Sequence, residues 1–411
     1  MPLPSSIDVA IIGAGAAGLG AARALEHSGL SVLVLEARNR LGGRAQTLIL
    51  PGDIRFDVGC EWLHSGDVNS FTLIAKKLGF TVDRNRPPWR EQSVDKGFPA
   101  KEREAFVTAL DEFYERAEIA AGREDDSAAS LCLEPGNRWN PMIDAVSTYV
   151  NGCELDSVSV HDMDAYEDTD VNWRVRQGYG ALIAAYGATC PVAFDTKVTL
   201  IDHSGARIRI ETSRGTIDAG KVIVTVPTDI IAREDIRFHP PLPDKVGAAA
   251  GLPLGLDNKV MLALAEPEAL PVDGSLRGAT MRTATGAYHL RPFGQACVGG
   301  FFGGTFAREL EAAGEGATAA AAIDEIVALL GNDFRRKLKP LGESRWASDP
   351  FARGSYSHAL PGHAEDRAIL AAPVDGRIFF AGEATSPHFF STAHGARDSG
   401  ERAAGEVMAI V

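Results

Sequence analysis

The stretch "IDVAIIGAGAAGLGAARALEHSGLSVLVLE" (7–36) decides the fold of this chain. It opens with an apolar run over 7–12 that predicts a buried strand, followed by a glycine-rich turn. The alanine-rich segment after the turn predicts a helix ending at Gly29, and "SVLVLE" (31–36) predicts a second buried strand that ends in an acid. A strand–turn–helix–strand unit of this kind is typical of a dinucleotide-binding domain.

The three glycines of the GxGxxG turn have separate physical roles. Gly13 permits the tight turn, Gly15 lets the backbone approach a pyrophosphate, and Gly18 lets helix and strand pack closely. The first N–H groups of the helix point at the anion, so we expect Ala16 and Ala17 to contact the cofactor as well.

An acid and two arginines follow the second strand. The carboxylate of Glu36 stands where it can accept hydrogen bonds from both ribose hydroxyls of an adenosine. In "EARNRLGGR" (36–44) an arginine lies on each side of a glycine pair, and both can reach the pyrophosphate, which favours FAD over NAD. The residues of this segment expected at the cofactor are Glu36, Ala37, Arg38, Gly43 and Arg44.

Composition limits the possible partners. The 411 residues carry a net charge of −14, which argues against a nucleic-acid or anionic-membrane surface and mildly favours cationic small molecules. Five cysteines without CxxC spacing predict neither a disulfide framework nor a metal site, and they fit a reducing compartment. With no basic leader and no apolar run of bilayer length, the chain is predicted to be soluble and cytoplasmic.

The run from Gly13 to Arg44 resembles the signature of the flavin-containing amine oxidases, which include monoamine oxidases, polyamine oxidases and histone lysine demethylases. Further stretches match in order along the chain. They are "DVGCEWLHS" (57–65), "KVIVTVPTDII" (221–231), "LDNKVML" (256–262), "RWASDPFARGSYS" (345–357) and "RIFFAGEATSPHFFSTAHGARDSGERAA" (377–404). The resemblance therefore covers essentially the whole chain.

The resemblance implies an α/β (α+β) fold with a discontinuous, Rossmann-type FAD-binding domain of the GxGxxG class. That domain would comprise 1–72, 174–248 and 349–411, and an interleaved substrate-binding domain of mixed sheet and helices would comprise 73–173 and 249–348. The residues themselves predict short strands over 198–227 with turns at "DHSG", "SRG" and "DAG", and helices over 100–122 and 318–338. Most carboxylates of the acidic segment 156–170 are expected in a solvated loop.

The same resemblance implies further cofactor contacts. The backbone at Val198 would contact the adenine, Glu383 would accept a hydrogen bond from the ribityl chain, and the helix after a Ser-Thr cap would point its N–H groups at the flavin C2 carbonyl. Ser355 stands where monoamine oxidases carry the flavin-linked cysteine, which implies non-covalent FAD. The additional residues expected at the cofactor are Glu61, Trp62, Val198, Val226, Pro227, Trp346, Gly382, Glu383, Thr392 and Ala393.

Four residues are implied in catalysis. Lys259 matches a buried lysine that holds a water against flavin N5, and burial is expected to lower the pKa of its ammonium. Tyr356 matches one wall of an aromatic cage, and Trp346 matches a tryptophan packed near Lys259. His64 could steer a polyamine, orient a water or simply lie on the surface, and the sequence leaves these open.

The predicted activity is oxidation of a primary or secondary amine, polyamines first, with O2 as acceptor and hydrogen peroxide as product. Trp62 stands where family L-amino-acid oxidases carry a carboxylate-binding arginine, and the long helical insertion of the histone demethylases is absent from the sequence. The alternatives are an L-amino-acid oxidase, a carbon–carbon oxidase such as a protoporphyrinogen oxidase or carotenoid desaturase, and a flavoprotein that uses FAD without oxidation. No heptad or repeat indicates an oligomeric state.

Overall fold

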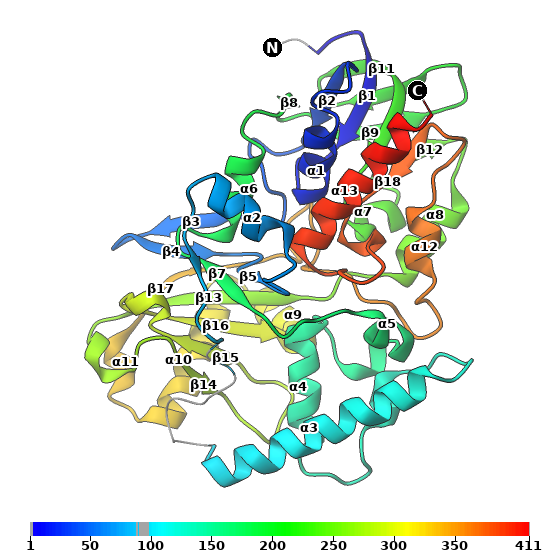
Figure 1. Cartoon of the computed structure of the whole chain (residues 1–411). Helices are drawn as coiled ribbons and strands as arrows, with labels where there is room; N and C mark the ends of the chain where they lie inside the picture. The colour runs from blue at the N-terminus through cyan, green and yellow to red at the C-terminus, as the bar shows by residue number, and fades with distance from the viewer. Residues whose placement is uncertain (1–2, 88, 90–97, 411) are drawn as a thin grey trace.

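Two sheets organise the chain (Figure 1). The structure is a computed structural model, and it describes residues 3–87, 89 and 98–410. The larger sheet has eight strands in the order β12-β9-β10-β11-β1-β2-β8, with β18 also pairing with β11. Its strands are β1 (Ser6–Ile12), β2 (Val32–Leu35), β8 (Val192–Ala193), β9 (Val198–Asp202), β10 (Ile208–Thr212), β11 (Gly215–Val224), β12 (Arg237–His239) and β18 (Ile378–Phe380).

The second sheet has five strands in the order β14-β15-β16-β13-β17, and every pairing in it is antiparallel. Its strands are β13 (Asp257–Leu264), β14 (Gly274–Arg277), β15 (Ala287–Leu290), β16 (Cys297–Gly303) and β17 (Leu338–Glu343). Two small sheets lie between the larger ones. They are built from β3 (Thr47–Leu50) with β4 (Ile54–Asp57), and from β5 (Trp62–Leu63), β7 (Trp173–Val175) and β6 (Val82–Asp83).

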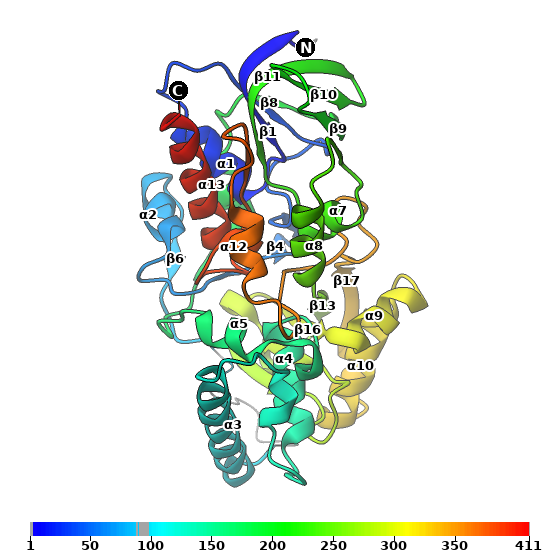
Figure 2. The ribbon, with the colours of Figure 1, turned by 90° about the vertical axis from the view of Figure 1, so that its right-hand side faces the viewer.

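Helices cover both large sheets (Figures 1 and 2). Those near the eight-stranded sheet are α1 (Ala16–Ala24), α2 (Ser70–Lys77), α6 (Tyr179–Tyr186), α7 (Thr228–Ala232), α8 (Pro243–Gly251), α12 (Asp366–Ala371) and α13 (Ala393–Met408). Those near the five-stranded sheet are α3 (Ala100–Ala121), α4 (Asn140–Val150), α5 (Val160–Ala165), α9 (Gly304–Ala313), α10 (Ala317–Leu330) and α11 (Phe334–Lys337). Among the described residues no helix is both long enough and apolar enough to cross a membrane.

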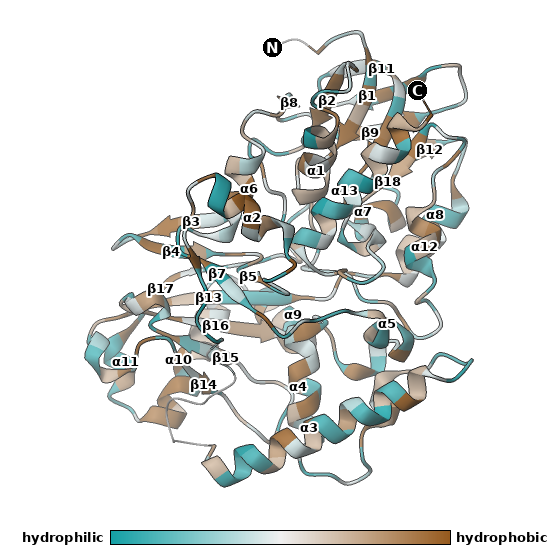
Figure 3. Cartoon of the chain, in the orientation of Figure 1, coloured by the Kyte–Doolittle hydropathy of each residue, from teal (hydrophilic) through white to brown (hydrophobic). Residues whose placement is uncertain are grey.

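The predicted strand–turn–helix–strand unit forms the centre of the eight-stranded sheet. Strand β1 pairs in parallel with β2 on one side and β11 on the other, and Ala10 and Ile11 of β1 are fully buried. A parallel strand buried on both faces reads as a continuous apolar run, and Figure 3 shows the central strands coloured mainly as hydrophobic. The mixed α/β class with a Rossmann-type nucleotide-binding unit is therefore confirmed.

The first and last helices of the chain, α1 and α13, lie side by side (Figure 2). Their backbones approach too closely for side chains at two glycines. A Cβ on Gly20 would lie 2.5 Å from the carbonyl oxygen of Arg397, and a Cβ on Gly400 would lie 2.0 Å from that of Ala17. These glycines allow the carboxy-terminal segment to dock on the first helix of the nucleotide-binding unit.

Several predicted boundaries differ from the structure. Helix α1 ends at Ala24 rather than at Gly29. The predicted turn at "DAG" (218–220) is wrong, because β11 continues through it and pairs there with both β1 and β10. The helix predicted over 318–338 is divided into α10 and α11 at Gly331, whose φ of 106° is left-handed.

Five of the six carboxylates in the acidic segment 156–170 are exposed, as predicted, and Asp162 is the exception; the predicted loop is interrupted by helix α5. Asp162 is only 2% exposed, and its carboxylate accepts hydrogen bonds from Arg367 at 2.5 and 2.8 Å. This buried pair connects α5 with α12, so Asp162 has a structural role that its neighbours lack.

We expect Gly400→Ala to destabilise the protein by about 1–3 kcal/mol, because the added methyl group meets the backbone of α1. Gly405→Ala in the same helix is the control. Its Cβ would have no neighbour within 4 Å, so this variant should gain up to about 1 kcal/mol from helix propensity. Urea unfolding of the FAD-loaded proteins measures both changes, and equal effects would contradict the role of Gly400.

Candidate active site

The amino terminus of α1 and the end of β2 form an anion-binding corner. The N-cap residue of α1 is Gly15, so no side chain caps the first N–H groups of the helix, and the first turn carries no acid. Glu36 is 3% exposed, and its carboxylate accepts hydrogen bonds from the backbone of Ala14 at 2.6 Å and of Arg38 at 2.8 Å. Free N–H groups and a fixed carboxylate side by side suit the pyrophosphate and ribose of a dinucleotide.

The glycines at this corner leave room for a ligand. Gly13 has a φ of 104°, and a Cβ on Gly18 would lie 1.9 Å from the carbonyl oxygen of Gly13. A Cβ on Gly15 would meet only the Cα of Gly43, at 4.0 Å, so the space beside this backbone is open. A cofactor can therefore approach Gly15, as expected for a pyrophosphate contact.

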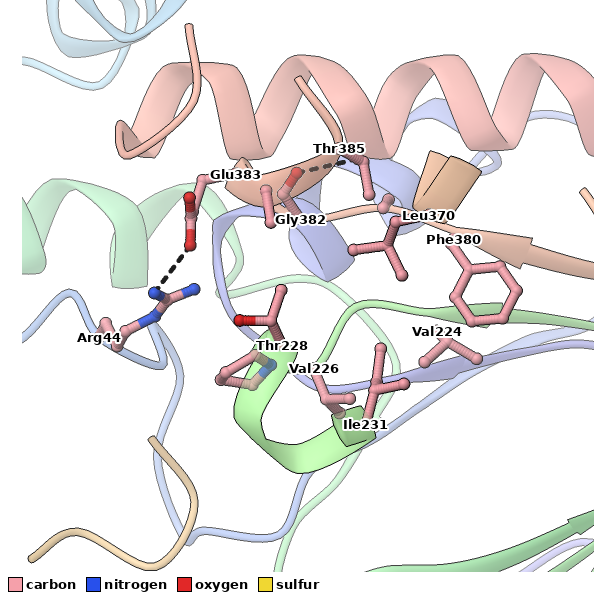
Figure 4. A pocket seen from close by; sticks show the side chains of 13 residues that line it. Arg44, Val224, Val226, Thr228, Ile231, Leu370, Phe380, Gly382, Glu383 and Thr385 are labelled. Carbon is pink, nitrogen blue, oxygen red and sulfur yellow. Dashed lines mark hydrogen bonds and ion pairs between the residues drawn. The ribbon is translucent and has the colours of Figure 1, made fainter. Parts of the chain in front are cut away.

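A cavity next to this corner brings together predicted residues from three parts of the chain (Figure 4). Among the residues lining it are Arg44, Val226, Pro227, Gly382 and Glu383. Arg44 donates to Glu383 at 2.9 Å, and this ion pair joins positions 339 residues apart. The predicted cofactor residues Arg44, Val226, Pro227, Gly382 and Glu383 thus lie together in space, although they are far apart in the sequence.

The carboxylate of Glu383 is strongly held. Burial alone would raise its pKa, but Arg44 and the hydroxyl of Ser357, which donates at 2.6 Å, lower that pKa below its ordinary 4.5. The backbone of Ser391 donates to the same group at 3.0 Å. Because these protein donors already use the carboxylate, its predicted bond to the ribityl chain remains a prediction.

Other predicted cofactor residues lie on the elements around this cavity. Val198 is the first residue of β9 and is 3% exposed. In the loop before β9, the backbone N–H of Thr196 donates a hydrogen bond to the carbonyl oxygen of Glu36 at 2.8 Å. Arg38 pairs with Asp349 at 2.5 Å, so its guanidinium is engaged by the protein. Ala16, Ala17, Ala37 and Gly43 lie on α1 or on the 36–44 segment.

The amino terminus of α13 has the predicted cap. The hydroxyl of Thr392 accepts a hydrogen bond from the backbone of Gly395 at 3.0 Å, and Ala393 is the first residue of the helix. The first turn carries no acid that would neutralise its N–H groups. This helix end can therefore stabilise negative charge on a group placed before it.

Lys259 lies on β13 with its side chain buried at 7% exposure. Its Nζ is 3.0 Å from a carboxylate oxygen of Glu61 and 3.3 Å from the carbonyl oxygen of Asp57, and it lies 5.0 Å from the centre of the Phe301 ring. The ammonium is thus fixed by an ion pair with the residue directly before Trp62.

The expectation of a lowered pKa for Lys259 is wrong. Burial acts in that direction, but the carboxylates of Glu61 and Asp257 outweigh it and raise the pKa of Lys259 above its ordinary 10.5. Burial likewise acts to raise the pKa of Glu61, and the ammonium of Lys259 reverses this and lowers it. The pair is therefore charged on both sides, as the 3.0 Å contact requires.

Trp346 and Tyr356 are held by hydrogen bonds from their polar atoms. The indole nitrogen of Trp346 donates to the carbonyl of Val58 at 2.9 Å, and its backbone donates to Asn258, the neighbour of Lys259. The hydroxyl of Tyr356 donates to the carbonyl of Tyr149 on α4 at 2.6 Å. Both aromatic rings are therefore fixed in orientation beside the strand that carries Lys259.

His64 is half-buried and is not a surface residue. Its Nδ1 lies 2.6 Å from the side-chain oxygen of Asn172, and burial lowers the pKa of the imidazole. The ring is therefore neutral near pH 7 with Nδ1 as donor, which leaves Nε2 as an acceptor.

Several residues near the site were not predicted from the sequence. Arg174 lies 5.0 Å from the ring of Trp62 and pairs with Asp273 at 2.8 Å. Asp257 lies two positions before Lys259 on β13, and burial raises the pKa of its carboxyl to about 8. The alternation of side chains along a strand was the available signal for Asp257, whereas Arg174 is brought in by tertiary structure alone.

Comparison with known proteins agrees with this arrangement. A family model described as flavin containing amine oxidoreductase matches residues 16–408. Polyamine oxidase 4 of Oryza sativa subsp. japonica is 30% identical over 97% of this chain and 88% of its own. Lysine-specific histone demethylase 1 homolog 2 of Arabidopsis thaliana is 28% identical over 98% of this chain, which spans only 58% of that relative.

A solved structure of a putrescine oxidase bound to putrescine is similar in fold, with a TM-score of 0.77 at 20% identity, and the match covers 98% of this chain and 99% of the other. The chain belongs to the flavin-containing amine oxidoreductases. Its cofactor is accordingly a flavin, and the dinucleotide-binding corner identifies FAD as the form.

We expect Glu36→Gln to weaken FAD binding roughly tenfold to hundredfold, because the substitution removes the charge that is predicted to accept hydrogen bonds from the ribose. Titration of flavin-stripped protein with FAD, followed by flavin fluorescence, measures the change. Glu211→Gln is the control, since Glu211 is exposed on β10 of the same sheet. Equal FAD affinity in both variants would show that Glu36 does not contact the cofactor.

Proposed function

We propose that this protein is an FAD-dependent amine oxidase that removes a hydride from the carbon next to an amine nitrogen. The observation that carries the proposal is the buried ammonium of Lys259, fixed on β13 and paired with Glu61 next to Trp62. Family membership supports an amine as the substrate class. Trp346 and Tyr356, both held beside β13, support a shaped chamber around the reacting carbon.

The chemistry that bound FAD supplies is acceptance of the hydride at N5 and reoxidation by O2, which yields hydrogen peroxide. Loss of the hydride leaves the substrate as an imine, and water hydrolyses this imine to an aldehyde and an amine. The protein's part is to position the amine in its uncharged form and to keep a fixed charge near the site of reoxidation.

Lys259 serves as a cation in this proposal. Glu61 raises the pKa of Lys259, so the lysine keeps its proton throughout the neutral range and cannot accept one from the substrate. A positive charge next to the reduced cofactor favours electron transfer to O2. Glu61 is therefore proposed as the residue that maintains this charge, in addition to its expected place at the cofactor.

We propose a polyamine-type chain as the substrate. Trp62 and His64 support this, since their spacing resembles that of polyamine oxidases and the neutral imidazole of His64 can accept a hydrogen bond from an amine. Tyr356 would form one wall of the amine site. The FAD is proposed to be non-covalent, because Ser355 stands where monoamine oxidases carry the flavin-linked cysteine. The hydroxyl of Ser355 accepts a hydrogen bond from the backbone N–H of Asp257 and donates one to its carbonyl oxygen, each at 2.9 Å.

We also propose that the chain is divided into the two discontinuous domains predicted from the sequence. All strands of the eight-stranded sheet fall within 1–72, 174–248 and 349–411, and all strands of the five-stranded sheet fall within 249–348. Helices α3, α4 and α5 fall within 73–173. This distribution supports an FAD-binding domain and a substrate-binding domain that alternate along the chain. A cytoplasmic location is likewise proposed, and the five cysteines of the structure are unpaired, in agreement with a reducing compartment.

Anaerobic mixing of the yellow protein with spermidine, acetylated polyamines, putrescine, tyramine and an L-amino acid tests the activity. We expect rapid loss of flavin absorbance with at least one amine. In Lys259→Met the return of absorbance on admitting air should slow by tenfold or more, because the positive charge is lost. Absence of bleaching with every amine would overturn the proposed function and favour carbon–carbon oxidation.

Glu61→Gln should introduce a new ionisation into the reaction with O2. Without the glutamate charge, burial dominates and the pKa of Lys259 falls, so the rate should decline with rising pH at values where the wild type is still constant. The rate of flavin reoxidation is measured by stopped flow between pH 6 and 10, and identical pH profiles of the variant and the wild type would refute the role of Glu61.

The Lys259–Glu61 ion pair also contributes to the stability of the native state. This contribution is fully present above the ordinary Glu pKa of 4.5 and is lost as pH falls through the lower pKa of Glu61.

A further inference from the structure

The proposed reaction requires a group that takes a proton from the substrate. An alkylamine has a pKa of about 10.4, like a lysine side chain, so at neutral pH it arrives as an ammonium without a free lone pair. Lys259 keeps its own proton, and Glu61 is committed to the ion pair with Lys259. The imidazole of His64 is a weak base, because burial lowers its pKa. The proton acceptor must therefore be another residue.

Asp257 lies on the same face of β13 as Lys259, two residues before it. The residue directly opposite Asp257 on β16 is Gly303, which adds no side chain to that face. A Cβ on Gly303 would lie 1.9 Å from the carbonyl oxygen of Thr148, so helix α4 approaches the sheet at this point. Asp257 therefore lies where α4 meets the face of the sheet that carries Lys259.

Asp257 is also fixed next to Tyr356, the proposed wall of the amine site. The hydroxyl of Ser355, the residue before Tyr356, is hydrogen-bonded to both the backbone N–H and the carbonyl oxygen of Asp257. The hydroxyl of Tyr356 donates to the carbonyl of Tyr149 on α4 at 2.6 Å. Burial, and after it the charge of Asp257, raises the pKa of Tyr356, so the carboxyl is near enough to act on the phenol.

The carboxyl of Asp257 has no donor inside the protein. Neither of its oxygens receives a hydrogen bond from the part of the chain that the structure describes, and Oδ1 is buried. Buried carboxyl oxygens normally have a hydrogen-bond partner. The residue as a whole is half-buried, so a ligand can reach it. An N–H group of a bound amine would supply the missing donor.

The environment of Asp257 gives its carboxyl the properties of a base. Burial raises its pKa to about 8, while the ammonium of Lys259 opposes this shift and the charge of Glu61 adds to it. A proton acceptor works best when its pKa lies near the working pH. The pKa of Lys259 is raised above 10.5, and that of Glu61 is lowered below 4.5. Burial also raises the pKa values of the uncharged groups nearby, which are Tyr149, Tyr356 and Cys153.

We propose that Asp257 is the catalytic base that takes the proton from the ammonium of the incoming amine. The inference rests on the proposed amine oxidase activity and adds a residue to it. An N–H bond of the ammonium breaks, an O–H bond forms on the carboxylate, and the electron pair stays on nitrogen. This lone pair then assists departure of the hydride from the neighbouring carbon to the flavin. Burial favours the proton transfer, because it disfavours the charges of both the ammonium and the carboxylate.

The pH dependence of anaerobic flavin bleaching at low amine concentration tests this role. The probe is putrescine or, if another of the amines named above bleaches the flavin faster, that amine. In the wild type the second-order rate constant should rise to about pH 8 and then stay within about threefold up to pH 10, because ionised Asp257 accepts the proton. In Asp257→Asn it should be roughly tenfold or more lower at pH 8 and should rise by about tenfold or more up to pH 10, because only the uncharged amine reacts.

Two further variants serve as controls. Asp144 on α4 is also half-buried with a raised pKa, but its carboxyl accepts hydrogen bonds from the backbone of Leu155 and the hydroxyl of Thr283. Asp144→Asn should therefore keep the wild-type pH profile. Asp257→Glu keeps a carboxylate and should retain the plateau above pH 8.

The shape of the profile separates a catalytic role from a structural one. If Asp257→Asn lowered the rate equally at every pH, or left the profile unchanged, the inference would be overturned. Asparagine has nearly the same shape as aspartate, so the Tm of the FAD-loaded variant should match that of the wild type. A clear fall in Tm would reveal an internal partner for the carboxyl and would also overturn the inference. Absence of bleaching with every amine, by contrast, would remove the proposed function itself.

Discussion

The close contact between α1 and α13 is the constraint on which the nucleotide site depends. These helices come from opposite ends of the chain, and they can pack only because Gly20 and Gly400 place no Cβ between the two backbones. The contact docks the carboxy-terminal segment, which also carries Glu383, on the nucleotide-binding unit. Arg44 and Glu383 then join the first and last segments of the chain with a partly buried ion pair.

Charge placement on one face of the five-stranded sheet distinguishes the substrate side. Lys259 is neutralised by Glu61, whose carboxylate oxygen lies 3.0 Å from its Nζ. A buried charge is stable only when an opposite charge or several hydrogen bonds compensate its loss of hydration. The buried ammonium of Lys259 meets this condition within the protein, through the carboxylate of Glu61 and the carbonyl oxygen of Asp57.

Local features of the sequence predicted the nucleotide-binding unit well. The glycine turn, the two buried strands and the terminal acid depend on short-range geometry, and the structure places Glu36 beside the turn as expected. The turn predicted at "DAG" was wrong because pairing with β1 and β10 outweighs the turn preference of Asp218 and Gly220. Tertiary pairing on both edges decides such a segment, and its composition does not.

The sequence by itself determined the order of the motifs, the Rossmann-type unit and the identity of the buried lysine. It could not determine the charge state of Lys259, because that depends on Glu61, which is 198 residues away in the chain and 3.0 Å away in space. It also could not show that Phe301 lies directly opposite Lys259, since the pairing register of β13 and β16 fixes that relation. Motif chemistry is local and readable along the chain, whereas electrostatic partnership and strand register are set only when distant segments meet.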